Sequence, residues 1–289
     1  MNLHLKSILF SNENKEKPSP GFILAVSLIS LIFACLPLFT KNCIQGHDID
    51  YHLLRIEALK TGIMNFRPFL RVNMLFFGGE GYASSLFYPD FILYFPALLR
   101  SLGFGINISY HLFVAFCIIS AYVSMFFSAR YISGNDGAAL GSAVVYTLCQ
   151  YHVDDIYTRA AVGEFTAFIF LPLICAGLYD LSSKGFRKPF ILGAGIAGVL
   201  LCHTLSTVFC LIFCVFYVLI NFRVLLRDPF RIVKLAVTAV LTMTITAFYW
   251  LPVMEQLSLM EFKYKDSVFD VAYEKLLFKD IFQNAAGRM

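Results

Sequence analysis

The sequence predicts an all-α integral membrane protein of about seven transmembrane helices, with interfacial or re-entrant helices in the first outer loop. Two observations lead to this fold class. Of the 289 residues 58% are hydrophobic and only 15% are charged, whereas soluble domains carry about 25% charged residues. The mean hydropathy is +0.71, and a core within one such chain cannot hide that much apolar surface from water. Lipid must therefore be the solvent for much of the chain.

Apolar runs of helical length supply the spans. The run from Pro189 to Phe222 would make a helix of about 50 Å, too long for a hydrocarbon core of about 30 Å. We expect "CHTLST" (202–207) to divide it into two antiparallel helices. The predicted spans are 22–39, 107–127, 137–151, 160–180, 189–204, 206–222 and 233–252.

The first run and the segment 86–104 need separate treatment. "FILAVSLISLIFACLPLF" (22–39) is longer than the apolar core of a signal peptide, so it is interpreted as a retained span. The segment 86–104 contains two prolines, an aspartate and an arginine. A straight spanning helix is disfavoured there, and we expect a re-entrant or interfacial segment.

Positive charge sets the predicted orientation in the cell membrane. Basic residues gather in the N-terminal tail and in two later loops, and seven spans place all three groups on the cytoplasmic side. The module is predicted to cover 21–255, after a cytoplasmic tail (1–20). Its outer loop is 40–106, and a short tail (256–289) follows that is consistent with a truncated, inactive frame. The basic groups are Lys6, Lys15, Lys17; Lys184, Arg187, Lys188; and Arg223, Arg227, Arg231, Lys234.

The first candidate site follows the first span, in "IQGHDIDYHLLRIEALKTGI" (44–63). A helix that starts at Asp48 puts Asp48, His52 and Arg55 on one face, at i, i+4 and i+7. Asp50 falls on the opposite side, and His47 flanks Asp48. The pattern is that of a short amphipathic helix in the membrane interface.

The second candidate site is "YHVDDIYTRAAVGEF" (151–165). Asp154 and Asp155 are adjacent, so like-charge repulsion requires a nearby cation, and Arg159 follows within one helical turn. Glu164 lies in the next apolar run, where it is either a functional carboxylate or a partner for Arg159. His203, at the outer end of its helix, is either a ligand contact or a polar helix–helix contact.

One carboxylate on each of two outer loops favours a group-transfer chemistry. A carboxylate can remove the proton of an acceptor hydroxyl while a basic residue stabilises a departing phosphate. Transfer of a sugar from a lipid phosphate fits this pattern, because the lipid tail of the donor would lie in the bilayer. Nucleic acid is excluded as a partner, since the sequence has no basic stripe and no recognition module.

The order of five segments supports that reading by resemblance. They are "GHDIDYHLLRIEALKTGI", "GYASSLFYPDFILYFPALL", "YHVDDIYTRAAVGEFTAFIFLPL", "HTLST" and "FYWLPVMEQ". Together they resemble bacterial multi-spanning proteins labelled 6-pyruvoyl-tetrahydropterin synthase-related, which are similar to the integral-membrane glycosyltransferases of the GT-C type. The resemblance covers roughly residues 20–260. The pterin label does not fit the residues, because the six His are scattered among apolar runs.

The GT-C resemblance implies a polyprenyl-phosphate sugar donor and an acidic residue in each of the first two outer loops. These positions match Asp48, and Asp154 or Asp155. It also implies that Asp48 and Asp50, as a D-x-D pair, are the place for a divalent metal if one is used. The residues alone indicate no cofactor.

Two alternatives stay open at this stage. One is a polytopic transporter or lipid flippase in which Glu164, His203 and the glycine-rich stretch 193–198 line a substrate path. The other is a non-catalytic membrane protein whose loop acids bind a partner. A transferase requires Asp48 and Asp154 or Asp155 to meet in one outer cavity, whereas a transporter requires a polar path to the cytoplasmic side.

Overall fold

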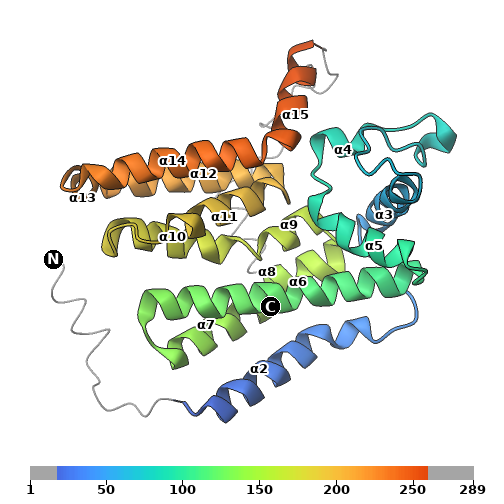
Figure 1. Ribbon diagram of the computed structural model, residues 1–289. Helices are drawn as coiled ribbons and strands as arrows, with labels where there is room; N and C mark the ends of the chain where they lie inside the picture. The colour runs from blue at the N-terminus through green and yellow to red at the C-terminus, as the bar shows by residue number, and fades with distance from the viewer. Residues whose placement is uncertain (1–17, 260–289) are drawn as a thin grey trace, which may run out of the picture. The chain divides into compact units, whose positions relative to one another are not determined.

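The computed structural model describes residues 18–259, and these form helices with one isolated antiparallel bridge between Asn73 and Tyr82 (Figure 1). The chain divides into two units, Met1–Tyr249 and Trp250–Met289. The helices that position the candidate site all belong to the first unit. The predicted tails 1–20 and 256–289 lie largely outside the described residues.

The first half of the described chain contains α2 (Pro20–Cys35), η1 (Leu36–Leu38), α3 (Ile49–Met64), η2 (Phe77–Gly79), α4 (Ser84–Phe87), η3 (Phe91–Leu93), α5 (Tyr94–Ser101) and α6 (Ile106–Ser133). The second half contains α7 (Asp136–Leu148), α8 (Gln150–Asp154), η4 (Asp155–Arg159), α9 (Val162–Ala167), α10 (Leu171–Ser183), α11 (Pro189–Leu200), α12 (Thr204–Ile220), α13 (Phe222–Leu226), α14 (Pro229–Ile245) and α15 (Ala247–Leu259).

Local sequence explains where several helices begin and end. Proline opens α2, α11 and α14, where its fixed φ suits the first turn and its missing N–H removes no helical bond. Gly134, with φ 68°, closes α6 in the left-handed conformation. Asn135 then caps α7, because its side chain accepts a hydrogen bond from the Ala138 N–H at 2.9 Å.

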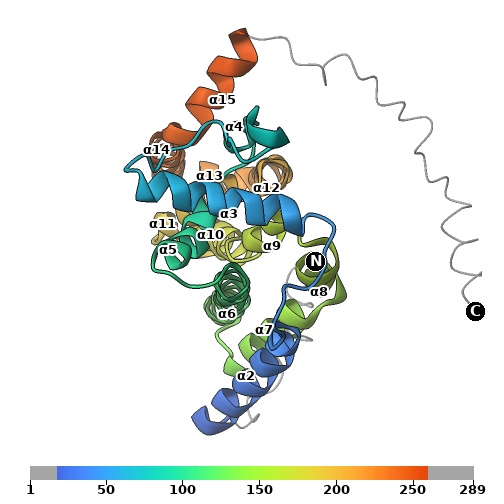
Figure 2. The same ribbon diagram turned by 90° about the vertical axis from the view of Figure 1, so that its right-hand side faces the viewer.

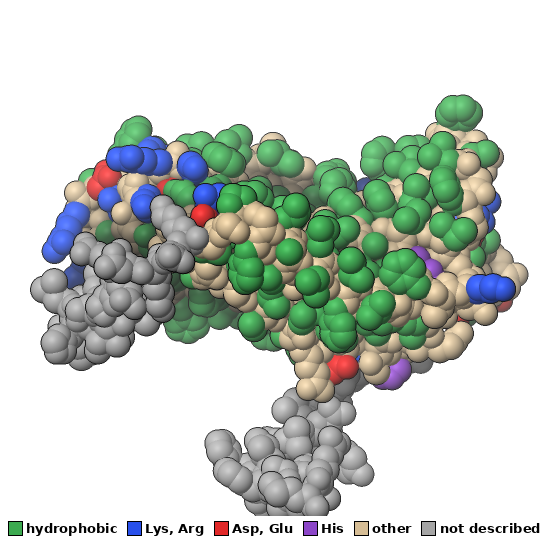
Figure 3. All heavy atoms as spheres, turned by 90° about the horizontal axis from the view of Figure 1, so that it is seen from below, with side chains coloured by type: hydrophobic (Ala, Val, Ile, Leu, Met, Phe, Trp, Pro, Cys, Tyr) green, Lys and Arg blue, Asp and Glu red, His purple; other side chains and the backbone are tan. Residues whose placement is uncertain are grey.

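The candidate spans are fewer than predicted. Of the described residues, three helical segments are long and apolar enough to cross a membrane: Pro20–Leu38, Ile106–Ser133 and Val162–Ser183. Pro229–Ile245 with Ala247–Leu259 makes a fourth if the pair is one span. These helices indicate a membrane protein, and Figure 3 shows hydrophobic side chains covering the middle of one face, with charged ones toward its ends.

The expected seven spans are not reached by length, because several apolar runs are interrupted. The predicted span 137–151 ends at Leu148, since Cys149 has an extended backbone. The predicted span 233–252 breaks at Thr246, whose hydroxyl donates to the Thr242 carbonyl at 2.8 Å. Such back-bonding bends helices. α7, α11 and α12 have 13, 12 and 17 residues, fewer than the roughly 20 that a span needs.

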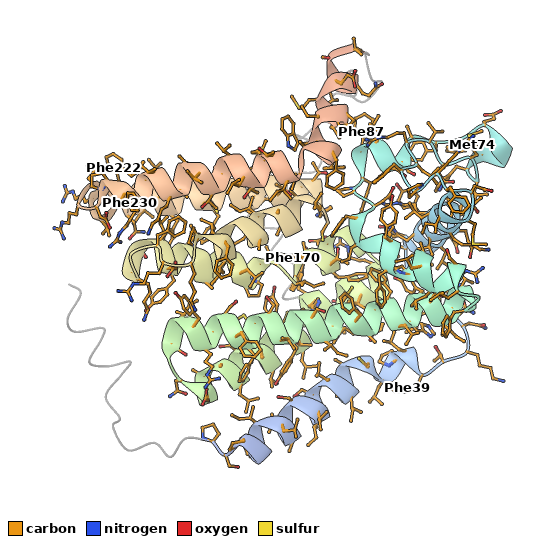
Figure 4. The ribbon with its side chains drawn as sticks, in the orientation of Figure 1. Phe39, Met74, Phe87, Phe170, Phe222 and Phe230 are labelled. Atoms are coloured by element: carbon orange, nitrogen blue, oxygen red, sulfur yellow. The ribbon has the colours of Figure 1, made fainter. Side chains whose placement is uncertain are left out.

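Glycine permits close packing between α9, α10 and α11. A Cβ placed on Gly198 would lie 2.0 Å from Cδ1 of Phe170, and one on Gly195 would lie 2.8 Å from Cγ1 of Ile174. Figure 4 shows Phe170 in the interior, between these helices. Neighbouring helices therefore fill the space beside these two glycines. A substrate path along 193–198 stays a prediction.

The helix α3 runs crosswise to the long helices. In Figure 2, α6, α12 and α14 are seen nearly end-on, and α3 runs crosswise to them, above α6. The segment 86–104 folds into parts of α4, η3 and α5 rather than one helix, in agreement with its prediction as a non-spanning segment. α5 packs between α3 and α6 and joins the crosswise helix to the bundle.

The opposite ends of α6, α10, α12 and α14 carry the basic loops, which Figure 3 shows as a group of blue side chains at one end. Asp180, fully buried, holds this end together. Its carboxylate accepts hydrogen bonds from the Tyr131 hydroxyl at 2.5 Å and from the Lys188 backbone N–H at 2.7 Å. Arg231 adds bonds to the carbonyls of Leu181 and Ser182, at 2.9 and 3.0 Å.

Candidate functional site

The start of α3 is bound to the segment that follows α8, although more than 100 residues separate them. The His47 N–H donates to the Thr158 carbonyl at 3.1 Å, and the Asp48 N–H donates to the Arg159 carbonyl at 3.0 Å. A Cβ on Gly46 would lie 2.7 Å from Cβ of Ala160, so glycine is required at this crossing. Both acid-bearing segments predicted from the sequence therefore meet at one end of the bundle.

The segment Asp155–Arg159 forms a single π-helical turn, and Ala160 follows with φ 52°. A left-handed conformation is unfavourable for an L-residue with a Cβ by roughly 1–2 kcal/mol. The hydrogen bond from the Ala161 N–H to the Asp155 carbonyl, at 2.9 Å, holds the turn closed. π-helical turns and strained backbones of this kind are found disproportionately at functional sites.

Four side chains form a connected group at this turn, here called the acid cluster: Asp155, Arg159, Glu164 and Tyr151. Arg159 Nη1 is paired with Asp155 Oδ1 and with Glu164 Oε2, the latter at 2.9 Å. The Tyr151 hydroxyl donates to Glu164 Oε1. The expected pairing of Arg159 with both acids is therefore present, and its side chain remains 44% exposed.

Asp155 differs from the other acids of the cluster in its burial. Its side chain is 0% exposed, and Oδ2 has no hydrogen-bond partner among the described residues. Burial, followed by the negative charge of Glu164, raises the pKa of Asp155 to about 6. A buried carboxylate with one unpartnered oxygen is unusual, because buried polar atoms are nearly always hydrogen-bonded. This oxygen can therefore take up a proton without losing a hydrogen bond to any described residue.

Asp48 is the exposed counterpart of Asp155. It occupies the N-cap position of α3, but its side chain makes no capping hydrogen bond. No ion pair involves it among the described residues, so its carboxylate is free. Asp154 is half-buried and accepts only a 3.5 Å contact from the Thr158 hydroxyl. His47 and Asp50 are exposed near the start of α3.

His52 and Arg55, predicted on the same face as Asp48, are instead buried beneath it, each 1% exposed. Arg55 donates to Asp90 Oδ1 from Nε at 3.0 Å and from Nη2 at 2.5 Å, and to the Pro89 carbonyl at 2.7 Å. Its Nη1 lies 3.2 Å from His52 Nδ1. The structure thus uses Arg55 to fix the turn 88–90.

Tyr88, in that turn, connects Arg55 to the acid cluster. Its ring lies 4.3 Å from the Arg55 guanidinium carbon, and its hydroxyl accepts the Gly163 N–H at 3.0 Å, next to Glu164. The ring of His203 is 6.1 Å from that of Tyr88. His203 Nδ1 lies 2.8 Å from the Ser206 hydroxyl, and burial lowers the pKa of His203. His203 therefore borders the site.

An apolar cavity of about 580 Å³ adjoins the same turn. Pro89 and Asp90 line it, together with the loop that carries Arg71. Because Arg55 already holds Asp90, Arg71 is the one charged group of the lining that has no carboxylate partner among the described residues. The remaining lining residues are Pro68, Phe69, Leu70, Ser85, Phe91, Tyr94, Leu201, Phe248 and Tyr249.

A divalent metal would find two carboxylates, Asp48 and Asp50, at the position that the sequence suggests for it. Residues 18–259 contain no group of three or more His, Cys, Asp or Glu side chains that could hold one. Asp48 and Asp50 offer two exposed carboxylates, and the described residues add no third ligand. No step of the chemistry is therefore assigned to a metal here.

Four further residues build this site and were not predicted from the sequence. Tyr88 and Tyr151 bind its backbone and its acids, and Asp90 neutralises Arg55. His152 is fully buried against the ring of Phe168, at a centroid distance of 4.3 Å, and its Nε2 has no partner among the described residues. One signal in the sequence pointed to the pair of Asp90 with Arg55. A charged residue in an apolar segment needs a partner of opposite charge, and Asp90 lies in such a segment.

The comparisons with known proteins give a family without an activity. A protein of Lactococcus lactis subsp. cremoris (strain MG1363), described as "Uncharacterized protein", is 26% identical to this chain over 261 residues. The match covers 85% of this chain and 41% of the relative, so the chain spans about two fifths of that protein. No solved structure matches. The profile of DUF6541, a family of unknown function, matches residues 10–285, and the chain belongs to this family.

Proposed function

We propose that the protein is a membrane glycosyltransferase that moves a sugar from a polyprenyl-phosphate donor to an extracytoplasmic acceptor. One observation carries the proposal. Asp48 is bound through its backbone to Arg159, which itself pairs with Asp155 and Glu164. A free carboxylate and a partly exposed guanidinium are thus carried by two segments whose backbones are hydrogen-bonded at one end of the bundle, which supports a general base and a phosphate partner acting together.

Asp48 acts as the general base. Its carboxylate is exposed and has no partner among the described residues, so an acceptor hydroxyl can reach it from the water side. The proton of the acceptor hydroxyl passes to Asp48 while the acceptor oxygen forms its bond to the sugar carbon. The bond between the sugar carbon and the phosphate oxygen breaks, and its electron pair leaves with the phosphate.

Arg159 stabilises the departing phosphate, and Asp155 controls its availability. The guanidinium is balanced by two carboxylates, which would repel an anion if both stayed charged. Because the pKa of Asp155 is raised to about 6, protonation of Asp155 on binding of the phosphate would free Arg159 from one of them. Glu164 and Tyr151 hold Arg159 in place, and His203 borders the sugar.

The membrane topology that accompanies this function has seven membrane helices with the N-terminus in the cytoplasm. It adds the shorter apolar helices α7, α11, α12 and α14 to the three long ones. The concentration of lysine and arginine at the end opposite α3 supports it (Figure 3). The acid cluster then faces the outside, where the lipid donor is reached at the membrane surface.

The test is replacement of Asp48 by Asn, with Asp50→Asn as the matched control in the same helix turn. We expect transfer from radiolabelled polyprenyl-phosphate sugar in membranes to fall by about 10²–10⁴-fold for Asp48→Asn. Asp50→Asn should retain most of the activity. Because Asp48 makes no side-chain bond, the thermal stability of both variants should match the parent.

Two results would contradict the proposal. Unchanged transfer by Asp48→Asn removes Asp48 from catalysis. A folded parent chain that transfers no sugar favours the alternative of a non-catalytic membrane protein. The transporter alternative gains no support from 193–198, where Gly195 and Gly198 contact neighbouring helices.

A further inference from the structure

The loop between α3 and α4 exposes an unusual amount of apolar surface for a segment outside the spans. We define the 64–82 loop as the end of α3 and the hairpin closed by the bridge between Asn73 and Tyr82. Loops exposed to water are rich in polar residues, and exposed apolar patches mark interaction sites. Here the exposed large side chains are Met64, Phe66, Phe69, Val72, Met74, Leu75, Phe77 and Tyr82.

The two phenylalanines Phe66 and Phe77 are held outward by an unfavourable backbone. Phe66 has φ 56° and is 94% exposed, and Phe77 has φ 54° and is 68% exposed. Left-handed conformations are rare for bulky residues, and strain of this kind accompanies function. The Phe77 ring contacts the rings of Phe76 and Tyr82, at centroid distances of 6.3 and 5.8 Å, and still leaves most of its surface exposed. Phe66, 94% exposed, has almost no packing within the chain.

Hydrogen bonds hold the 64–82 loop in one conformation. Asn73, 1% exposed, exchanges backbone hydrogen bonds with Tyr82 at 2.8 and 3.0 Å. Its side chain donates to the Leu54 carbonyl of α3 at 3.3 Å and accepts the Leu75 N–H at 2.9 Å. The hairpin is therefore fixed to α3, which lies crosswise to the long helices (Figure 2).

The charges of the 64–82 loop identify the partner. Arg67 and Arg71 are exposed and lack a carboxylate partner among the described residues, and Glu80 is the loop's only acid. A second copy of this surface would bring arginines together, whereas lipid phosphates complement them.

Met74 of the 64–82 loop lies at the same end of the molecule as the exposed Phe39, which follows α2, and Phe222 and Phe230 lie at the other end (Figure 4).

We infer that the 64–82 loop inserts into the outer leaflet of the cell membrane. Phe66 and Phe77 lie among the lipid chains, and Arg67 and Arg71 contact phosphates of the headgroups. Aromatic side chains favour this interface, and arginine reaches the phosphates from it. The loop anchors α3, and with it Asp48, at the lipid surface. This interaction holds whether or not the protein transfers sugars.

Fluorescence tests the inference directly, since the chain has a single tryptophan, Trp250. In a Trp250→Phe background, Phe66→Trp and Phe77→Trp are compared with Asp50→Trp, an exposed polar position at the other end of α3. Each variant is reconstituted in vesicles of phosphatidylcholine and phosphatidylglycerol with brominated chains. We expect bromine quenching and protection from aqueous iodide at positions 66 and 77, and the reverse at position 50.

Two results would overturn the inference. Iodide quenching at 66 and 77 equal to that at 50 would mean that the loop lies in water. Protection from both iodide and bromine would mean that a protein, such as a second copy, covers it. A second measurement compares quenching by brominated phosphatidylglycerol with quenching by brominated phosphatidylcholine. With both arginines present, we expect phosphatidylglycerol to be preferred by up to about fivefold per arginine, and the double variant Arg67→Gln, Arg71→Gln should lose this preference. An unchanged preference would show that neither arginine binds headgroups.

Discussion

Asp180 and Asp155 are both fully buried aspartates, but the chain satisfies them differently. At the basic end, both carboxylate oxygens of Asp180 accept hydrogen bonds, from the Tyr131 hydroxyl and the Lys188 N–H. At the acid cluster, Asp155 uses Oδ1 for Arg159, while Oδ2 has no partner among the described residues. Glu164 adds a second negative charge nearby and helps to raise the pKa of Asp155.

The difference separates a carboxylate that holds the fold from one that is kept available. Asp180 closes the turn between α10 and α11, where its backbone carbonyl also accepts the N–H groups of Lys184 and Phe186, at 3.1 and 2.9 Å. Asp155 lies in a π-helical turn beside a left-handed alanine, in a less favourable environment for its charge. Proteins tolerate such arrangements mainly where function needs them.

The largest stability effect is expected for Asp180→Ala. It leaves the Tyr131 hydroxyl and the Lys188 N–H without their acceptor, and hydrogen bonds to a charged group contribute about 1.5–3 kcal/mol each. We predict a loss of about 3–5 kcal/mol in the free energy of unfolding, measured by titration with SDS. Asp228→Ala is the matched control, because its ion pair with Arg231 is at the surface and contributes less than about 1 kcal/mol. A loss of less than about 1 kcal/mol for Asp180→Ala would contradict the structural role that distinguishes Asp180 from Asp155.

A smaller stability effect is expected for Asp155→Asn. The amide oxygen of Asn can still accept from Arg159, and no donor to Oδ2 is lost among the described residues. We predict a change below about 1 kcal/mol in the same SDS titration, because removal of a poorly satisfied buried charge offsets the weakened pair. A loss as large as that of Asp180→Ala would show that Asp155 is a second structural carboxylate.

The pH dependence of stability separates the two aspartates further. The pKa of Asp155 is about 6 in the folded protein, above its ordinary value of 3.8. Between these values the folded state binds the proton more tightly than the unfolded state, so this carboxyl lowers stability as pH rises from about 4 to about 6. We predict that Asp155→Asn removes this part of the pH profile. An unaltered profile would assign the titration to another group.

The smallest effect is expected for Glu164→Gln. Glu164 is the second cause of the raised pKa of Asp155, so neutralising it should move the pH midpoint of that transition downward. Burial, the first cause, remains, and the midpoint should stay above the ordinary aspartate value. The same pH series of SDS titrations measures it. An upward shift would mean that Glu164 acts mainly by holding Arg159.

Helix positions were largely predictable from the sequence, because they depend on local signals. The apolar runs and the break expected at 202–207 place the helices close to where they are found. The break at Thr246 and the end of α7 at Leu148 depend on backbone detail that hydropathy does not encode. Among the described residues three segments, or four with the bent pair, are long enough to span by themselves, so length alone does not confirm the seven predicted spans.

The site was predictable only in its residue types. Asp48, Asp155, Arg159 and Glu164 stand out as charges beside apolar runs. The burial of Arg55 could not be inferred, because its partner Asp90 is 35 residues away and the pair depends on how α3 crosses the bundle. The left-handed conformation of Ala160 was equally hidden, since no local signal marks it and Gly46, which packs against it, is more than 100 residues away.

The contact between the start of α3 and the turn after α8 is the central claim, and disulfide trapping tests it most directly. His47 and Thr158 are exposed and joined by a 3.1 Å backbone hydrogen bond, which puts their backbones within the roughly 7 Å that a disulfide can bridge. In a chain without its native cysteines, His47→Cys with Thr158→Cys should cross-link under mild oxidation, and Asp50→Cys with Thr158→Cys should not. Failure of the first pair to cross-link in folded protein would contradict the convergence of the two acid-bearing segments.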